Sequence, residues 1–166
     1  TLRAAMVEKT ASSDGGVGQS PGWIIGAAIA LFAFCVRALP LRHVFIDGQT
    51  YFTDSDSYYH LRRIAYNIAS FPETLEHDPY LNFPDGAKAI WPQTLDWLLA
   101  ALIWPFHSIG TEPNYERFLA WVPPLLGALT VLVVYRLVAR HFGQREAIVA
   151  GLVLAILPAH YWYSQV

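Results

Sequence analysis

Three hydrophobic segments alternate with polar stretches along this chain. They occupy residues 21–41, 118–138 and 147–166, and the only Asp, Glu, Lys or Arg in the first of them is Arg37. Each approaches the roughly 20 apolar residues that an α-helix needs to cross a bilayer. The pattern therefore predicts an all-α membrane protein with three transmembrane helices, the third of which leads into the start of a further outer loop.

The first hydrophobic segment follows a polar N-terminal stretch. Residues 1–20 show no periodicity, which predicts a flexible cytoplasmic tail. A cleavable signal peptide is the alternative, since Arg3 and Lys9 precede the segment, but no small-residue cleavage site follows Cys35. We therefore favour a membrane span in which Arg37 extends its guanidinium outward to water.

A long, net acidic stretch, residues 42–117, separates the first two hydrophobic segments. Prolines divide it into short pieces, at Pro72, Pro79, Pro84 and Pro92. One apolar piece, 97–106, is about half the length of a span, which favours a re-entrant or interfacial helix. We expect 42–117 to be the first extracytoplasmic loop, with short helices of its own.

The placement of basic residues predicts the orientation. Segment 139–146 holds Arg140, His141 and Arg145 around a tight turn at Gly143. Cytoplasmic loops carry an excess of Lys and Arg, so this short basic loop is expected in the cytoplasm. The N-terminus then lies in the cytoplasm and the long acidic loop outside. If residues 97–106 also crossed the membrane, the orientation of the first span would be reversed and the long acidic loop would lie on the other side.

Composition supports a membrane protein and narrows the function classes. Hydrophobic residues make up 54% of the chain, charged residues only 14% and aromatic residues 14%. The net charge of −2 excludes the usual basic nucleic-acid footprint. No Ser-His-Asp order, glycine-rich phosphate loop or Cys/His metal spacing occurs, and the single Cys35 permits no disulfide within the chain.

A helix is predicted to begin in the acidic loop. Its apolar positions recur at helical spacing, at Tyr58, Leu61, Ile64, Ala65 and Ile68. Asp54 or Ser55 suits the N-cap, and Asp56 falls in the first turn, where the helix dipole favours an ionised carboxylate. Arg62 and Arg63 are expected on the water-facing side.

Asp54 and Asp56 allow two interpretations. In the first, they are a helix cap and a companion charge, which is a common composition for a helix start. In the second, two carboxylates spaced i, i+2 provide part of a site for Mg²⁺ or Mn²⁺, which prefer oxygen ligands. Two carboxylates do not complete such a site, so further ligands would have to come from elsewhere.

Five other residues are weaker candidates. His77-Asp78 lies in a proline-rich turn and is expected to brace the loop. His60 is expected to be packed or interfacial, and Asp96 is expected to cap a short apolar helix or lie in its first turn, with no catalytic role. His160 is a functional candidate because titratable groups at membrane depth are costly, although it also fits an interfacial position.

The order of these parts resembles the catalytic subunits of oligosaccharyltransferases, closest to the single-subunit bacterial and archaeal enzymes. The resemblance extends from Trp23 to the last residue. The residues that carry it are Arg37-Ala38-Leu39-Pro40, Asp54-Ser55-Asp56-Ser57-Tyr58-Tyr59-His60-Leu61-Arg62, His77-Asp78-Pro79-Tyr80, Phe83-Pro84-Asp85-Gly86-Ala87, Trp91-Pro92 and Leu157-Pro158-Ala159-His160-Tyr161.

The resemblance implies the N-terminal part of a GT-C polytopic helical bundle. It implies inverting transfer of a glycan from a lipid-linked polyprenyl or dolichyl phosphate or diphosphate donor to Asn in an Asn-X-Ser/Thr acceptor polypeptide. It assigns Asp56 to the acid that binds Mg²⁺ or Mn²⁺ and contacts the acceptor amide, and Asp54 to the first place of a D-x-D-like pattern. It also implies a prokaryotic inner or plasma membrane, with the site facing the periplasm or exterior.

Several parts of the family pattern are absent. The chain ends at Val166, before the family's second acidic motif, its later Glu-bearing loop and its soluble Trp-Trp-Asp domain. We therefore expect the N-terminal portion of a longer polypeptide, inactive by itself. The alternatives are another GT-C glycosyltransferase that uses a polyprenyl-phosphate sugar, and a non-catalytic membrane scaffold subunit.

Overall fold

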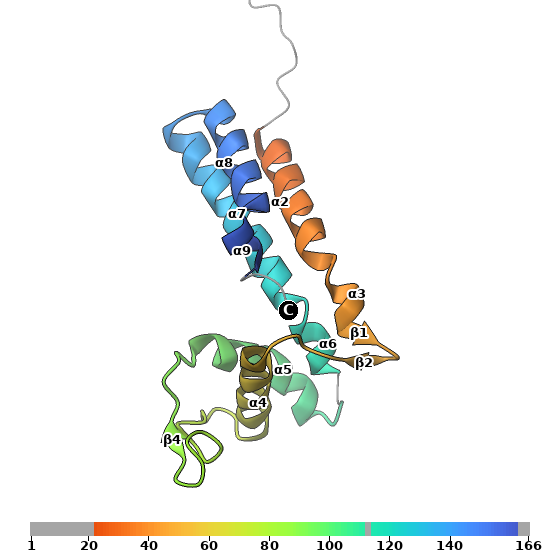
Figure 1. The fold of residues 1–166 in the computed structure, drawn as a ribbon, viewed down its shortest axis with the longest axis vertical. Coiled ribbons are helices and arrows are strands. Elements are labelled where there is room, and N and C mark those ends of the chain that lie inside the picture. Colours follow the sequence, from red (N-terminus) through yellow and green to blue (C-terminus); the bar gives the residue numbers. More distant parts are fainter. Residues whose placement is uncertain (1–21, 112–113, 163–166) are drawn as a thin grey trace, which may run out of the picture.

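The computed structural model describes residues 22–111 and 114–162, with backbone alone at 161 and 162. The described part is mostly helical (Figure 1). The predicted tail, residues 1–20, lies outside it. In chain order the elements are α2 (Gly22–Ala38), α3 (Leu41–Val44), β1 (Phe45–Ile46), β2 (Gln49–Thr50), α4 (Ser55–Ala69), β3 (His77–Asp78), β4 (Ala87–Lys88), α5 (Thr94–Ser108), α6 (Tyr115–Leu119), α7 (Val122–His141), α8 (Gln144–Ile156) and α9 (Pro158–Trp162).

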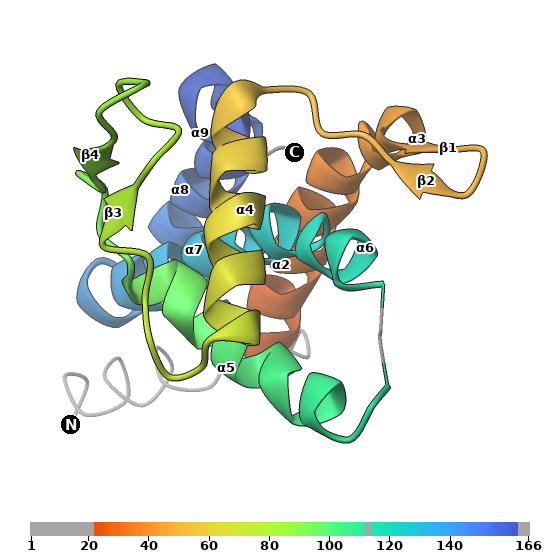
Figure 2. The same cartoon turned by 90° about the horizontal axis from the view of Figure 1, so that it is seen from below.

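Three helices, α2, α7 and α8, pack side by side as a bundle (Figures 1 and 2). Two helical stretches are long and apolar enough to cross a membrane, Gly22–Val44 with 23 residues and Tyr115–His141 with 27. The third predicted span gives a regular helix of only 13 residues, α8. It ends there because Leu157 is extended, with φ −58° and ψ 120°, and Pro158 has no N–H to continue the helix.

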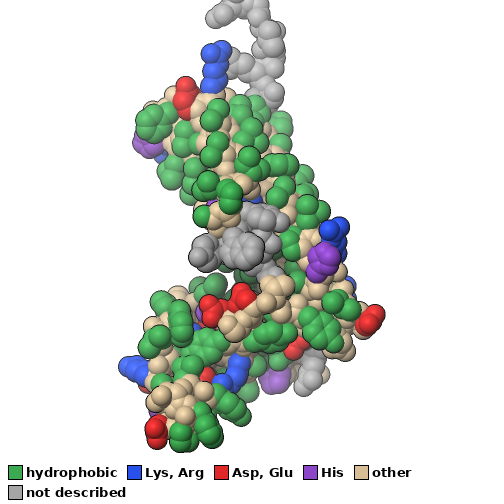
Figure 3. Space-filling model, viewed as in Figure 1, with side chains coloured by type: hydrophobic (Ala, Val, Ile, Leu, Met, Phe, Trp, Pro, Cys, Tyr) green, Lys and Arg blue, Asp and Glu red, His purple; other side chains and the backbone are tan. Residues whose placement is uncertain are grey.

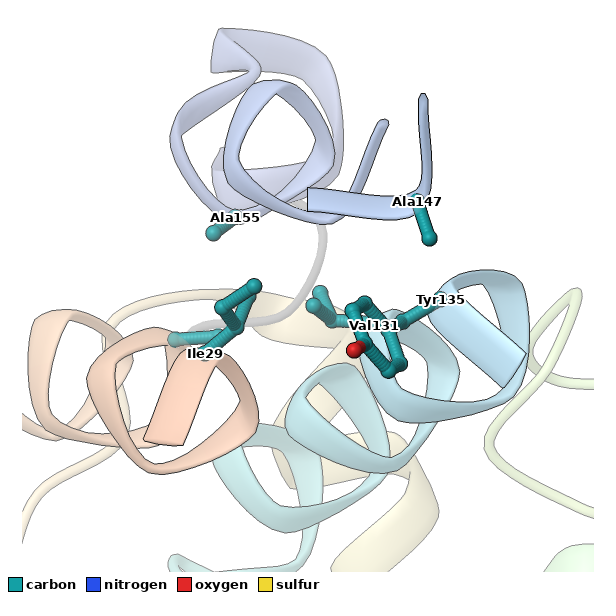
Figure 4. Close-up of a cluster of buried hydrophobic side chains, with 6 residues drawn as sticks. Ile29, Val131, Tyr135, Ala147 and Ala155 are labelled. Atoms are coloured by element: carbon teal, nitrogen blue, oxygen red, sulfur yellow. The ribbon is translucent and has the colours of Figure 1, made fainter. Parts of the chain in front are cut away.

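Small side chains bring the bundle helices close together. Ala33, Ala147 and Ala155 are buried among Ile29, Val131 and Tyr135 (Figure 4). A Cβ added to Gly26 would lie 2.6 Å from Cε1 of Tyr135, so only glycine allows this approach. The Tyr135 hydroxyl donates to the Gly22 carbonyl at 2.7 Å and accepts from Nε2 of Gln144 at 2.8 Å. Close contact through small residues is the packing that membrane helices use.

The outer faces of the bundle are apolar. Leu31, Leu129, Leu137 and Val149 are all exposed on the three helices. Figure 3 shows hydrophobic side chains along the middle of the visible bundle face, with charged side chains gathered toward its ends and over the loop region. A surface of this kind is suited to lipid contact. The predicted tight turn at its basic end is confirmed, because Gly143 joins α7 and α8 with φ +117°.

Arg37 does not extend outward as predicted, because the end of α8 binds it inside the bundle. Its side chain is fully buried. Nη1 donates to the carbonyls of Ala33 and Ala155, each at 3.0 Å, and Nη2 donates to the Leu154 carbonyl at 3.4 Å and contacts Nδ1 of His160. The carbonyls of residues 154 and 155 lie at the end of α8, where the helix has no further backbone N–H groups to donate to them. The guanidinium therefore caps this negative helix end.

The long loop folds against the end of the bundle where α2 finishes and α7 begins. Its main unit is the pair α4 and α5, which lie across that end (Figure 2). Ile64 and Ile68 of α4 pack against Leu99, Ala100 and Ile103 of α5. The apolar piece 97–106 thus belongs to a 15-residue helix, α5, which is too short to be a span.

We predict that Arg37→Met destabilises the bundle, because the carbonyls that end α8 lose their charged donor. The expected loss is about 2–3 kcal/mol in the free energy of unfolding. Unfolding in detergent, followed by circular dichroism, measures it. Arg42→Met is the matched control, since Arg42 is exposed and its side chain bonds only to His43 among the residues that the structure describes. Equal stability of the two variants would contradict the capping role.

Candidate functional site

Asp54 is the N-cap of α4. Its backbone is extended, with φ −134° and ψ 162°, and its Oδ1 accepts from the backbone N–H groups of Asp56 at 2.6 Å and Ser57 at 3.2 Å. These are two of the donors that a helix start leaves without a helical partner. The predicted cap and helix are confirmed. One carboxylate oxygen of Asp54 is therefore engaged, and Oδ2 has no hydrogen bond within the described part of the chain.

Asp56 lies in the first turn of α4 and is exposed. Within the described ranges its carboxylate has no hydrogen bond or ion pair. Its backbone is nevertheless held, by the Asp54 cap and by a contact just before the helix. There the Phe52 N–H donates to the Tyr58 hydroxyl at 3.2 Å, and the two rings meet edge to face at 5.5 Å. The fold presents the carboxylate of Asp56 to solvent on a fixed backbone.

Asp96 joins α5 to α4 on the buried side of α4. The Asp96 side chain is 1% exposed, and its Oδ1 lies 2.8 Å from Nδ1 of His60. Its Oδ2 lies 3.0 Å from Nε of Arg63, an ion-pair contact without hydrogen-bond alignment. The hydrogen bond that His60 donates to Asp96 raises the pKa of His60, although burial and the nearby Arg63 act in the opposite direction.

The predicted water-facing position of Arg63 is wrong. The side chain is fully buried, because Asp96 pairs with it and Tyr59 covers it, with the guanidinium carbon 5.3 Å from the ring centre. Nη2 also reaches the carbonyls of Trp91 and Pro92, each at 3.4 Å. The periodicity of α5 could have indicated that Asp96 is buried, because Asp96 lies on the same helix face as the buried Ala100 and Ile103.

Asp78 braces the loop between α4 and α5, as the sequence predicted for this turn. It is fully buried, and its Oδ1 accepts from Nη2 of Arg62 at 2.5 Å and from the N–H of Tyr80 at 2.8 Å. The Arg62 guanidinium also lies 4.1 Å from the centre of the Tyr80 ring. Burial alone would raise the pKa of Asp78, but the hydrogen bonds from Tyr80 and Arg62 outweigh it and lower this pKa.

The described residues hold part of a metal site at most. No three His, Cys, Asp or Glu side chains converge anywhere in residues 22–111 and 114–160. Asp56 and the free oxygen of Asp54 are hard oxygen donors of the type that Mg²⁺ and Mn²⁺ prefer, so they fit such an ion, but as an incomplete ligand set. His160 contacts Arg37 at the α8 end, and His60 pairs with Asp96.

We predict that Asp54→Ala shortens or frays α4, because two backbone donors lose their acceptor. A cap loss of this type costs about 1 kcal/mol in the free energy of unfolding. Asp54→Asn is the matched control, since an amide oxygen caps equally well. Thermal unfolding of the three proteins tests this, and a loss that Asn shares with Ala would argue against capping.

We predict that Arg62→Met changes the acid sensitivity of the loop. The folded state lowers the Asp78 pKa, so this carboxylate stabilises the fold above its unfolded value of 3.8, and the contribution is lost as pH falls through the folded pKa. In the variant the pKa of Asp78 rises. The protein is then less stable at neutral pH, and its stability falls less steeply as the pH is lowered. Melting temperatures between pH 7 and pH 3 measure both effects, and parallel curves for variant and parent would contradict the pairing.

Comparison with known proteins identifies the family. The family described as "Oligosaccharyl transferase STT3, N-terminal" matches residues 24–165. The dolichyl-phosphooligosaccharide-protein glycotransferase 1 of Archaeoglobus fulgidus is 31% identical over 143 residues, which are 84% of this chain and 23% of the relative. The dolichyl-monophosphooligosaccharide-protein glycotransferase AglB of Haloferax volcanii is 31% identical over 115 residues, or 68% of this chain and 11% of the relative.

A Pyrococcus furiosus glycotransferase, also named dolichyl-phosphooligosaccharide-protein glycotransferase 1, is 27% identical over 135 residues, covering 81% of this chain and 13% of the relative. No solved structure matches the chain significantly. The chain thus spans less than a quarter of the length of these relatives. With the matched family covering nearly all of it, and with two helices of membrane length, this chain belongs to the membrane-embedded N-terminal region of the STT3 oligosaccharyl transferase family.

Proposed function

We propose that this chain is part of an oligosaccharyltransferase that moves a glycan from a lipid-linked phosphate or diphosphate donor to Asn in Asn-X-Ser/Thr. The family match and the names of the archaeal relatives support this reaction class. The observation that carries the assignment of the site is Asp56. Its carboxylate is exposed and unpaired within the described residues, on a capped helix at one end of the bundle.

We also propose a membrane arrangement of three spans, 21–41, 118–138 and 147–166, as the start of a GT-C bundle in a prokaryotic inner or plasma membrane. The contacts of α8 with both α2 and α7 support a place for it in the same layer. Arg140, His141 and Arg145 lie at the end of the bundle opposite α4. The positive-inside rule then puts 139–146 in the cytoplasm, and it puts Asp56 on the outer side with loop 42–117.

Asp56 addresses the difficult step of the transfer. The side-chain nitrogen of Asn is a poor nucleophile because its lone pair is conjugated with the carbonyl. A carboxylate that accepts an N–H hydrogen bond from this amide twists or polarises the group and favours attack on the sugar carbon. The N–C bond forms while the bond from that carbon to the phosphate oxygen breaks on the opposite side, so the configuration at the carbon inverts. The proton that the nitrogen loses passes to the carboxylate or to the departing phosphate.

A bound Mg²⁺ or Mn²⁺ would neutralise negative charge on the leaving phosphate. Asp56 and Oδ2 of Asp54 are the residues of this chain that would hold it. Such ions take about six ligands, so the remaining ligands would have to come from water, from substrate phosphate or from regions of the relatives' length that this chain does not cover. We therefore expect no transfer by this chain alone.

We predict that Asp56→Asn in the full-length polypeptide lowers turnover by about a hundredfold or more, the size of effect that follows removal of one charge-stabilising group. The assay follows glycan transfer from a lipid-linked donor to an Asn-X-Thr peptide in detergent or liposomes. Asp85→Asn is the matched control, because Asp85 is an exposed acid of the same loop with no side-chain partner in the described residues.

The two variants separate a site role from a general charge effect. Full activity of Asp85→Asn beside a slow Asp56→Asn supports the proposal. Turnover by Asp56→Asn at the parent rate would refute it, and equal losses in both variants would assign the effect to the charge of the loop.

A further inference from the structure

Asp96 is a buried carboxylate on the apolar face of α5. It belongs to the first turn of α5, and the neighbouring buried positions of that helix are Leu99, Ala100 and Ile103. Burying an ionised carboxylate is costly unless charged or hydrogen-bonding groups surround it. Within the described residues, the charged and hydrogen-bonding contacts that compensate Asp96 come from α4, the helix that carries Asp56.

Each oxygen of Asp96 holds a different residue of α4. Oδ1 binds His60 and Oδ2 faces Arg63, three positions further along. Residues at i and i+3 lie on one face of a helix, one turn apart. Two contacts one turn apart fix the rotation of α4 about its own axis as well as its position along α5. The apolar contacts between the helices are non-directional and permit either helix to rotate.

Rotation of α4 matters because of where Asp56 lies. Asp56 is four residues before His60, so its side chain lies near the same face, about 6 Å further along the helix axis. A carboxylate about 6 Å from the axis moves by about 1 Å when the helix turns by roughly 10°. Misplacement of a reacting group by 1 Å reduces rates by up to about a hundredfold.

We propose that Asp96 is a positioning residue for Asp56, acting through His60 and Arg63 to hold the rotation of α4. The proposal rests on the function proposed above for Asp56. It assigns to Asp96 a role that its place in α5 did not suggest, since a first-turn acid is ordinarily explained by the helix dipole alone. Arg63 is also held by its contact with the Tyr59 ring and by hydrogen bonds from Nη2 to Trp91 and Pro92, so Asp96 links this side chain to His60.

The test is Asp96→Asn in the full-length polypeptide. An amide has the same shape but no charge and one acceptor oxygen, so it can accept a hydrogen bond from only one of His60 and Arg63 and forms an ion pair with neither. We expect kcat per folded molecule to fall about tenfold or more, while KM for the acceptor peptide changes less than twofold. Folded protein is quantified by size-exclusion chromatography and by the melting temperature of each sample.

A double variant separates positioning from stability. In Asp96→Asn with Arg63→Gln, no buried charge lacks a partner, so we expect the melting temperature to recover toward that of the parent. The slow kcat is expected to remain, because His60 still lacks its carboxylate. Recovery of kcat together with the melting temperature would overturn the proposal and make Asp96 a structural residue only.

Asp78→Asn provides the matched control. It also removes a buried carboxylate paired with an arginine of α4, but Asp78 lies in the loop rather than in α5. We expect it to lower the melting temperature with kcat per folded molecule unchanged. A parent-like rate for Asp96→Asn beside a slow Asp56→Asn would refute the positioning role alone, whereas a parent-like rate for Asp56→Asn would refute the proposed function.

Discussion

Buried charge is the constraint on which this architecture depends. Arg37, Arg63, Asp78 and Asp96 are all fully or almost fully buried, and each has at least one partner from another element. An unpartnered charge in such surroundings costs far more than any single apolar contact contributes. Each pairing is therefore satisfied in one arrangement of its helices. Apolar packing brings the helices together, and these polar contacts specify how they are placed.

The polar contacts divide between two environments. In the bundle, small residues allow α2, α7 and α8 to approach closely, and Arg37 completes the hydrogen bonding of a helix that Pro158 interrupts. In the outer loop, Asp96 of α5 holds α4, and Arg62 of α4 in turn holds the proline-rich turn through Asp78. The result is a helix whose buried side is held at several points and whose first turn is left open to solvent. A reactive carboxylate needs this combination of a rigid support and a free head group.

Local sequence signals predicted the elements well. The two longer hydrophobic segments, the turn at Gly143, the helix after Asp54 and the cap itself all follow from composition and periodicity over a few residues. The partners of Arg37 and Arg63 did not follow, because Ala155 and Asp96 lie far away in the chain. From the sequence alone, Arg37 and Arg63 are long charged side chains, and both were therefore expected to reach water. Only the fold places an acceptor close enough to keep each of them inside.

The site was predictable to the same extent. Spacing identified Asp54 and Asp56, since a cap and a first-turn acid are local features. The group of His60, Arg63 and Asp96 could not be predicted from local sequence, because it forms only where α4 packs against α5. A loop held by the Arg62–Asp78 ion pair separates these two helices in the chain. The apolar face of α5 contained the only hint of it, a carboxylate at a position where the periodicity requires a buried side chain.

The joint between α4 and α5 has a thermal consequence. The hydration of ions becomes less favourable on heating, so the cost of withdrawing Arg63 and Asp96 from water falls as temperature rises. Contacts between Ile64 and Leu99 gain no comparable advantage. At high temperature this joint would therefore lose less stability than the apolar contacts beside it, which would help to keep the first turn of α4 aligned.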